Sequence, residues 1–169
     1  MKFEDLLMRE KGAVLSPCGS YRYLLTRRWD DTGSMACFVM LNPSTADADR
    51  DDPTIRRCIS FAEQWDCASL AVVNLFAYRA TEPDALKEAE DPVGPQNDLY
   101  IKRLLNEQPE YVVCAWGAFK FAKRRVARVL SLIREQELTP VCLGMTAGGG
   151  PRHPLYVNRG IGYRIYHGE

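Results

Sequence analysis

The sequence predicts a single α/β domain over residues 1–169, a three-layer sandwich in which helices cover both faces of a short, mostly parallel central sheet. Two observations lead to this prediction. Strands buried on both faces read as continuous apolar runs, and such runs occur at Met35–Leu41, Leu70–Asn74, Tyr111–Trp116 and Pro140–Leu143. Helical patterns separate the runs, and this alternation is typical of right-handed crossovers between parallel strands.

An antiparallel hairpin is expected at the N-terminal side of the central sheet. Tyr21–Trp29 alternates well enough for an outer strand, and Asp30–Gly33 supplies a turn with a glycine suited to positive φ. Met35–Leu41 then serves as the second strand of the hairpin and as the first central strand.

Three helices are expected after the first central strand. The first begins with Asp52 as N-cap and Pro53 at the first helical position. The second covers Gln96–Leu105, and the third carries an apolar stripe from Phe119 to Ile133. The other faces of the third helix are basic, with Lys120, Lys123, Arg124, Arg125 and Arg128. Such a face is usually solvated, although it can contact phosphates.

The composition limits the partners of the chain. Lys+Arg and Asp+Glu both number 22, so no overall positive field attracts nucleic acid, although a local patch can still bind it. No signal peptide or membrane-spanning stretch is recognisable, and we expect no membrane partner. The six cysteines contain no C-x-x-C pair and mostly lie in apolar runs. They therefore indicate reduced, packed thiols and a cytoplasmic location.

No metal or cofactor is indicated by the motifs. The acidic run Asp47–Asp52 lacks the glycine and the final acid of an EF-hand. The phosphate-loop, dinucleotide-binding, nucleophile-elbow and zinc-protease motifs are absent. The oligomeric state stays open.

Polar side chains follow the apolar runs, where ligands bind in open α/β sheets. Asn42 and Asn74 end the first two runs, Trp116-Gly117 ends the third, and a Gly/Pro-rich loop with His153 follows the fourth. This pattern predicts one binding site. Structural interpretations stay open, because Asn42 before a proline can simply end a strand and Asn74 can satisfy neighbouring backbone groups. His153 belongs to no apolar stripe, which favours a functional role.

Five motifs occur in order along the chain: Leu41–Asp47, Asn74–Arg79, Asp91–Asp98, Trp116–Gly117 and Pro151–Tyr156. Together they resemble a family of bacterial and phage proteins catalogued as domain of unknown function family 1643. The resemblance covers most of the chain and implies no established activity.

The motif order is also similar, more distantly, to the uracil-DNA glycosylase superfamily, which implies a three-layer fold around a short parallel sheet. In that superfamily a polar residue followed by proline positions the attacking water, and Asn42-Pro43 matches it. An asparagine that recognises the pyrimidine edge matches Asn74. A His-Pro loop matches His153-Pro154, with Leu155 or Tyr156 as the wedge that enters the duplex.

The resemblance implies hydrolysis of the N-glycosidic bond of a nucleobase in nucleic acid, with Asn42 and His153 as the catalytic residues. Asn74, Leu155 and Tyr156 contact the substrate, and the rest of the expected substrate-binding set is Pro43, Ser44, Phe76, Tyr78, Trp116 and Gly117, with Phe76 or Tyr78 stacking on the base. Asn42 has no carboxylate, so catalysis is expected to be slow. Two alternatives stay open: a non-catalytic module that binds a nucleotide or modified base, and a hydrolase of free nucleosides or nucleotides.

Overall fold

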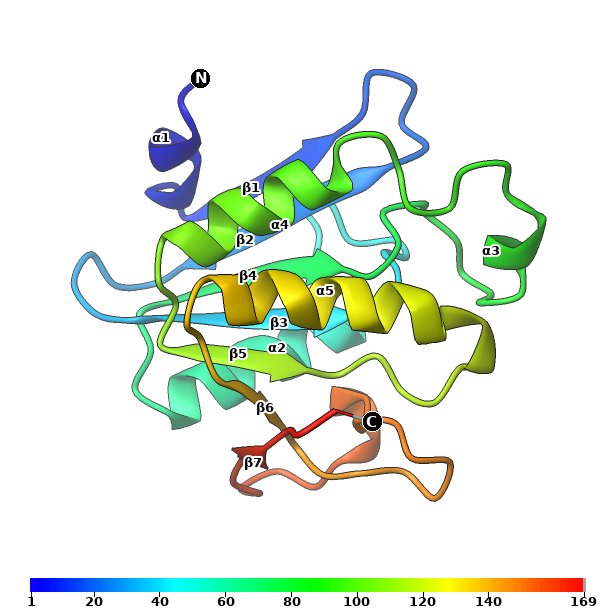
Figure 1. The fold of residues 1–169 in the computed structure, drawn as a ribbon. Helices are drawn as coiled ribbons and strands as arrows, with labels where there is room; N and C mark the ends of the chain where they lie inside the picture. The colour runs from blue at the N-terminus through cyan, green and yellow to red at the C-terminus, as the bar shows by residue number, and fades with distance from the viewer. Residues whose placement is uncertain (169) are drawn as a thin grey trace.

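The computed structural model describes residues 1–168, and within them seven strands form one mixed sheet in the order β1-β2-β4-β3-β5-β6-β7. The strands are β1 (Lys11–Leu15), β2 (Arg22–Arg28), β3 (Met35–Met40), β4 (Ser69–Asn74), β5 (Tyr111–Cys114), β6 (Pro140–Cys142) and β7 (Arg164–Ile165). The neighbours β4, β3, β5 and β6 are parallel, so their carboxyl ends share one edge of the sheet. That edge lies on the right of Figure 1.

Helices cover both faces of the sheet. The longer ones are α2 (Pro53–Gln64), α4 (Asn97–Asn106) and α5 (Lys123–Glu135), and the short ones are α1 (Phe3–Leu7), α3 (Ala85–Glu88), η1 (Lys120–Ala122) and η2 (Pro154–Tyr156). Helix α2 packs on one face, and α4 and α5 pack side by side on the other, in front of the sheet in Figure 1. The predicted start of α2 is confirmed, because Oδ1 of Asp52 accepts a hydrogen bond from the Ile55 N–H at 2.9 Å and Pro53 is the first helical residue.

Two expectations about the sheet are wrong. Strand β4 lies between β2 and β3, so Tyr21–Trp29 and Met35–Leu41 do not form a hairpin, and the N-terminal hairpin is β1–β2 instead. The sheet is also not mostly parallel, because three of the six pairings within residues 1–168 are antiparallel. The apparent alternation of β2 misled the prediction, because its polar residues Arg22, Thr26 and Arg27 are buried rather than exposed.

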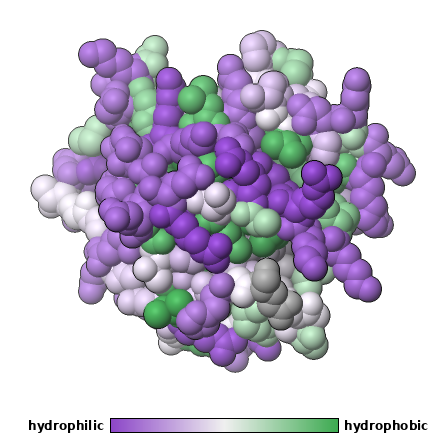
Figure 2. Space-filling model, viewed as in Figure 1, coloured by the Kyte–Doolittle hydropathy of each residue, from purple (hydrophilic) through white to green (hydrophobic). Residues whose placement is uncertain are grey.

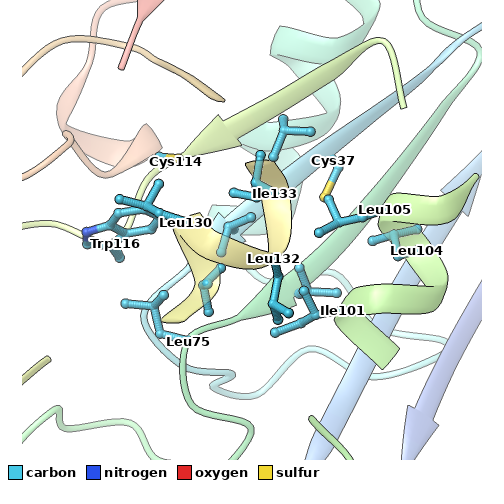
Figure 3. Close-up of a cluster of buried hydrophobic side chains, with 14 of the residues drawn as sticks. Cys37, Leu75, Ile101, Leu104, Leu105, Cys114, Trp116, Leu130, Leu132 and Ile133 are labelled. Atoms are coloured by element: carbon cyan, nitrogen blue, oxygen red, sulfur yellow. The ribbon is translucent and has the colours of Figure 1, made fainter. Parts of the chain in front are cut away.

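Each face of the sheet has its own hydrophobic core. On one side, apolar residues of α4 and α5, among them Ile101, Leu130 and Ile133, pack against the sheet (Figure 3). On the other side, Ile55 and Phe61 of α2 pack against the opposite face. Figure 2 shows that the surface over α4 and α5 is mainly hydrophilic, as expected for amphipathic helices. All six cysteines are free and five are buried, and Cys18 is the exposed one.

The basic side of α5 is not wholly solvated. Arg125 is buried, forms an ion pair with Asp98 of α4, and donates a hydrogen bond to the Leu75 carbonyl. Arg128 binds the same carboxylate at 3.1 Å. The other basic residues of this segment, Lys120, Lys123 and Arg124, are exposed. Part of the predicted basic face therefore joins α4 and α5 to each other and to the chain after β4.

Candidate functional site

A cavity of about 580 Å³ lies at the carboxyl edge of the parallel strands. Its volume is within the range of about 300–1,000 Å³ that is usual for small-molecule sites. Eight of the residues singled out in the sequence line it: Asn42, Ser44, Asn74, Trp116, Gly117, His153, Leu155 and Tyr156. They lie at or after the carboxyl ends of β3, β4, β5 and β6, so residues far apart in the chain meet because these parallel strands end at one edge.

The Asn42 amide is held in one orientation. Its Nδ2 donates to the carbonyl of Pro43 at 3.1 Å and to the carbonyl of Ala80 at 2.8 Å. An amide nitrogen has two hydrogens, so both are used and Oδ1 remains as an acceptor. Asn42 can therefore accept a hydrogen bond from a water or a ligand hydroxyl at the cavity wall.

Asn74 is the most unusual polar group of the cavity. Its side chain is 1% exposed, and neither Oδ1 nor Nδ2 has a hydrogen-bond partner. Leaving such a group unsatisfied costs about 1–3 kcal/mol, so these atoms are expected to meet a ligand or an ordered water. The backbone at this position is fixed, because Nδ2 of Asn97 donates to the carbonyls of Asn74 and Leu75 at 3.0 and 3.1 Å. Asn97 is therefore a positioning residue in the Asp91–Asp98 motif.

His153 is placed to act as a neutral hydrogen-bond donor. Its Nδ1 accepts from the N–H of Leu155 at 3.2 Å, so the neutral ring carries its proton on Nε2. Burial lowers the pKa of His153, and the carboxylate of Asp52 opposes this effect. The imidazole is consequently neutral at pH 7, and Nε2–H is available to a ligand oxygen.

The aromatic residues of the cavity differ from those expected. Phe76 is buried in the core against Phe121, and Tyr78 packs edge-on against Tyr21 beside a neighbouring hollow. Neither lines the cavity, so the expected stacking role does not fit their positions. The aromatic rings that do line it are Trp116, Phe119 and Tyr156. The side chain of Trp116 is at the edge of the core cluster in Figure 3 and packs against Tyr166.

Gly117 and Pro43 contribute through the backbone. Gly117 has φ +76°, a conformation that favours glycine, and its N–H donates to the carbonyl of Pro151 at 2.8 Å. A Cβ on Gly150 would lie 2.0 Å from the carbonyl oxygen of Gly117, so the two loops approach closely at this point. Pro43, expected to contact the substrate, is buried and does not line the cavity, and its carbonyl accepts a hydrogen bond from Asn42 Nδ2.

Three charged residues of the cavity were not anticipated: Arg22, Asp52 and Glu82. Arg22 comes from the start of β2 and is 3% exposed, while Asp52 caps α2. Burial lowers the pKa of Arg22 to about 10, and the carboxylate of Asp52 counteracts this. Arg22 is therefore charged at pH 7. The signal that could have found it is a charged residue in a strand whose neighbours, Tyr21 and Tyr23, are aromatic.

The fold and the cavity define an α/β protein with a concave polar site beyond the carboxyl ends of its parallel strands. A family model described as "Protein of unknown function (DUF1643)" matches residues 22–155, which is most of the chain, so the chain belongs to this family. Searches of curated proteins and of solved structures gave no match.

None of the helices within residues 1–168 has the length and apolar character needed to cross a membrane. No three His, Cys, Asp or Glu side chains gather there in a way that could hold a metal ion.

Proposed function

We propose that the cavity binds a nucleobase and that the protein hydrolyses the N-glycosidic bond of its ligand. The observation that carries this proposal is the buried amide of Asn74, whose donor and acceptor are both unpartnered at the cavity. A pyrimidine edge or a similar planar amide offers a complementary acceptor and donor side by side. Apolar and aromatic side chains around a few oriented polar groups are typical of such sites.

In the proposed reaction, water adds to the anomeric carbon as the C–N bond breaks, and the bonding electrons leave with the base. Asn42 Oδ1 orients the water by accepting its hydrogen bond. His153 Nε2–H donates to a carbonyl oxygen of the departing base, where negative charge develops. The products are the free base, which takes up one proton, and the sugar, which keeps the hydroxyl.

The proton released by the water needs an acceptor, and the cavity contains two carboxylates. Asp52 and Glu82 both line it, whereas Asn42, the residue expected to position the water, has no carboxylate. Asp52 is favoured, because it influences the pKa of both His153 and Arg22. Its Oδ1 caps the Ile55 N–H, which leaves Oδ2 for the proton.

The similarity to the uracil-DNA glycosylase superfamily is part of this proposal. Four parallel strands between two helical layers, and a cavity shared by Asn42, Asn74 and His153, are consistent with it. Leu155 and Tyr156 are exposed at the cavity and are the proposed wedge residues if the base lies in a duplex. We propose the cytoplasm as the location, consistent with six unpaired thiols.

The test is incubation with oligonucleotides that contain uracil, hypoxanthine or a mismatch, and in parallel with free nucleosides and nucleotides. Alkali then reveals abasic sites in the oligonucleotides, and chromatography detects released base. We expect release that falls at least about 100-fold in Asn42→Ala and in His153→Ala. His167→Ala is the matched control, since His167 is exposed and does not line the cavity. Release that persists in both cavity variants would contradict the mechanism.

A second candidate is a module that binds the base without cleaving it. It is favoured by one observation: Asn42 has no titratable group to activate the water directly. Binding of a nucleoside without release of base, abolished by Asn74→Ala, would establish this alternative.

A further inference from the structure

Arg22 is a buried cation without a carboxylate partner. Its guanidinium donates one hydrogen bond, from Nη1 to the Ala46 carbonyl at 2.7 Å, and its Nε is buried without a partner. No carboxylate oxygen of residues 1–168 lies within 4.0 Å of it. Asp52 and Asp47 act on it only from a greater distance. A buried charge without a close counter-charge is costly, so its presence at a cavity calls for an explanation.

Arg27, on the same strand, is a buried arginine with a structural role, and its partners can be compared with those of Arg22. It is equally buried, at 3% exposed, but it pairs with Asp51 at 2.7 Å. It also donates to four backbone carbonyls, those of Gly12, Thr26, Asp47 and Arg50. Arg27 does not line the cavity, whereas Arg22 does. The unpaired arginine is therefore the one that a ligand can reach.

The first turn of the 12-residue helix α2 lines the same cavity with Thr54 and Ile55. The Ile55 N–H is occupied by Asp52, whereas the Thr54 N–H is one of the first four N–H groups of the helix, which have no acceptor within the helix. The positive end of a helix favours an anion at this point. The carboxylate of Asp52 at this helix end repels an anion. An anion can therefore bind here only if the Arg22 guanidinium contacts it directly.

We propose that Arg22 and the first turn of α2 bind the phosphate group of a free nucleotide whose base lies against Asn74. The nucleotide part rests on the proposed function, while the anion site does not. A small ligand is favoured over a nucleic-acid strand, because Arg22 is 97% buried and the lining also contains Asp52 and Glu82. A planar guanidinium matches two phosphate oxygens, which a lysine cannot do.

The experiment is calorimetric titration of the ligand-free protein with inorganic phosphate, with four nucleosides and with their 5′-monophosphates. We expect a monophosphate to bind at least tenfold more tightly than its nucleoside, and inorganic phosphate to compete with it. Arg22→Met removes this advantage, so that the monophosphate binds no more tightly than its nucleoside, and Arg22→Lys keeps part of the advantage. Arg27→Lys is the matched control on the same strand and leaves phosphate affinity unchanged within twofold.

The possible outcomes test the base-binding function and the phosphate site separately. Nucleosides that bind or are cleaved, with no gain from the phosphate, overturn the anion site and leave the proposed function standing. Phosphate binding that requires Arg22, with no nucleoside bound, supports the anion site and contradicts the base pocket. If Arg22→Met does not fold, Thr54→Val and the wild-type comparison of nucleotide with nucleoside decide the question. A 5′-phosphorylated oligonucleotide that binds more tightly than the mononucleotide overturns the preference for a free nucleotide.

Discussion

The two buried arginines of β2 are expected to contribute very differently to the stability of the protein. Arg27→Met removes the ion pair with Asp51 and the hydrogen bonds that Arg27 donates to the Thr26 and Asp47 carbonyls, so we expect a loss of about 2–4 kcal/mol in the free energy of unfolding. Arg22→Met removes a charge without a close partner, so we expect a change of less than about 1 kcal/mol in either direction. Denaturant unfolding in phosphate-free buffer measures both. Equal losses in the two variants would show that Arg22 is structural.

His153 makes stability depend on pH. Burial places its pKa in the folded protein below the ordinary value of 6.5, so the unfolded chain binds a proton first as the pH falls. The free energy of unfolding should therefore decrease as the pH is lowered through 6.5, and the decrease ends below the folded pKa. His153→Gln should flatten this part of the profile. The check is unfolding at a series of pH values between 7.5 and 5, and an unchanged profile in the variant would disprove the assignment.

The polar residues of the site were predictable to different degrees. Asn42, Asn74 and His153 could be found, because each follows an apolar run and parallel strands end at one edge. Arg22 was missed, because arginine is seldom buried and its only signal in the sequence is its place between Tyr21 and Tyr23. Asp52 was recognised as a helix cap, and only the three-dimensional arrangement reveals that the same carboxylate faces the cavity.

At the scale of elements, the helices were easier to predict than the sheet. The cap at Asp52 and the apolar stripe of α5 are local signals, and local hydrogen bonds determine where a helix starts. Strand neighbours are set by contacts distant in sequence, so the insertion of β4 between β2 and β3 has no local signature. Strand β1 was not predicted, because it is short, contains Gly12 and is only partly buried.

The loop contact between Gly117 and Gly150 gives a prediction at this scale. In Gly150→Ala the new methyl group would lie 2.0 Å from the Gly117 carbonyl oxygen and 2.7 Å from the Ala118 Cα. These are backbone atoms, so both loops have to move, and we expect a loss of about 1–3 kcal/mol together with weaker ligand binding. Gly162→Ala is the control, because a Cβ there meets nothing within 4 Å. Thermal unfolding and nucleotide titration of both variants check this, and similar behaviour of the two would contradict it.

At the scale of the whole molecule, the two hydrophobic cores and the candidate site meet at the carboxyl edge of the sheet. The two hydrophobic cores lie on the faces of the sheet, while the cavity lies at its carboxyl edge. Core residues such as Ile55 and Trp116 form part of the cavity wall, next to groups that are unfavourable for folding, the Asn74 amide and the Arg22 guanidinium. The chain reverses direction across the sheet after β4, and such a switch point is where open sheets bind ligands.

The net charge leads to the last prediction, which concerns salt. With 22 basic and 22 acidic residues, the molecule has no overall positive field, and acidic residues line the cavity. A ligand bound by one guanidinium releases few counterions, so the logarithm of the mononucleotide affinity should fall with the logarithm of the salt concentration at a slope no steeper than about −1. A single strand tracked by the exposed basic residues of α5 would instead contribute about −0.7 for each phosphate contacted. Titration of a mononucleotide and a 12-mer between low and high salt distinguishes the two. A slope near −3 for the 12-mer, with tight binding, would mean that the protein acts on nucleic acid after all.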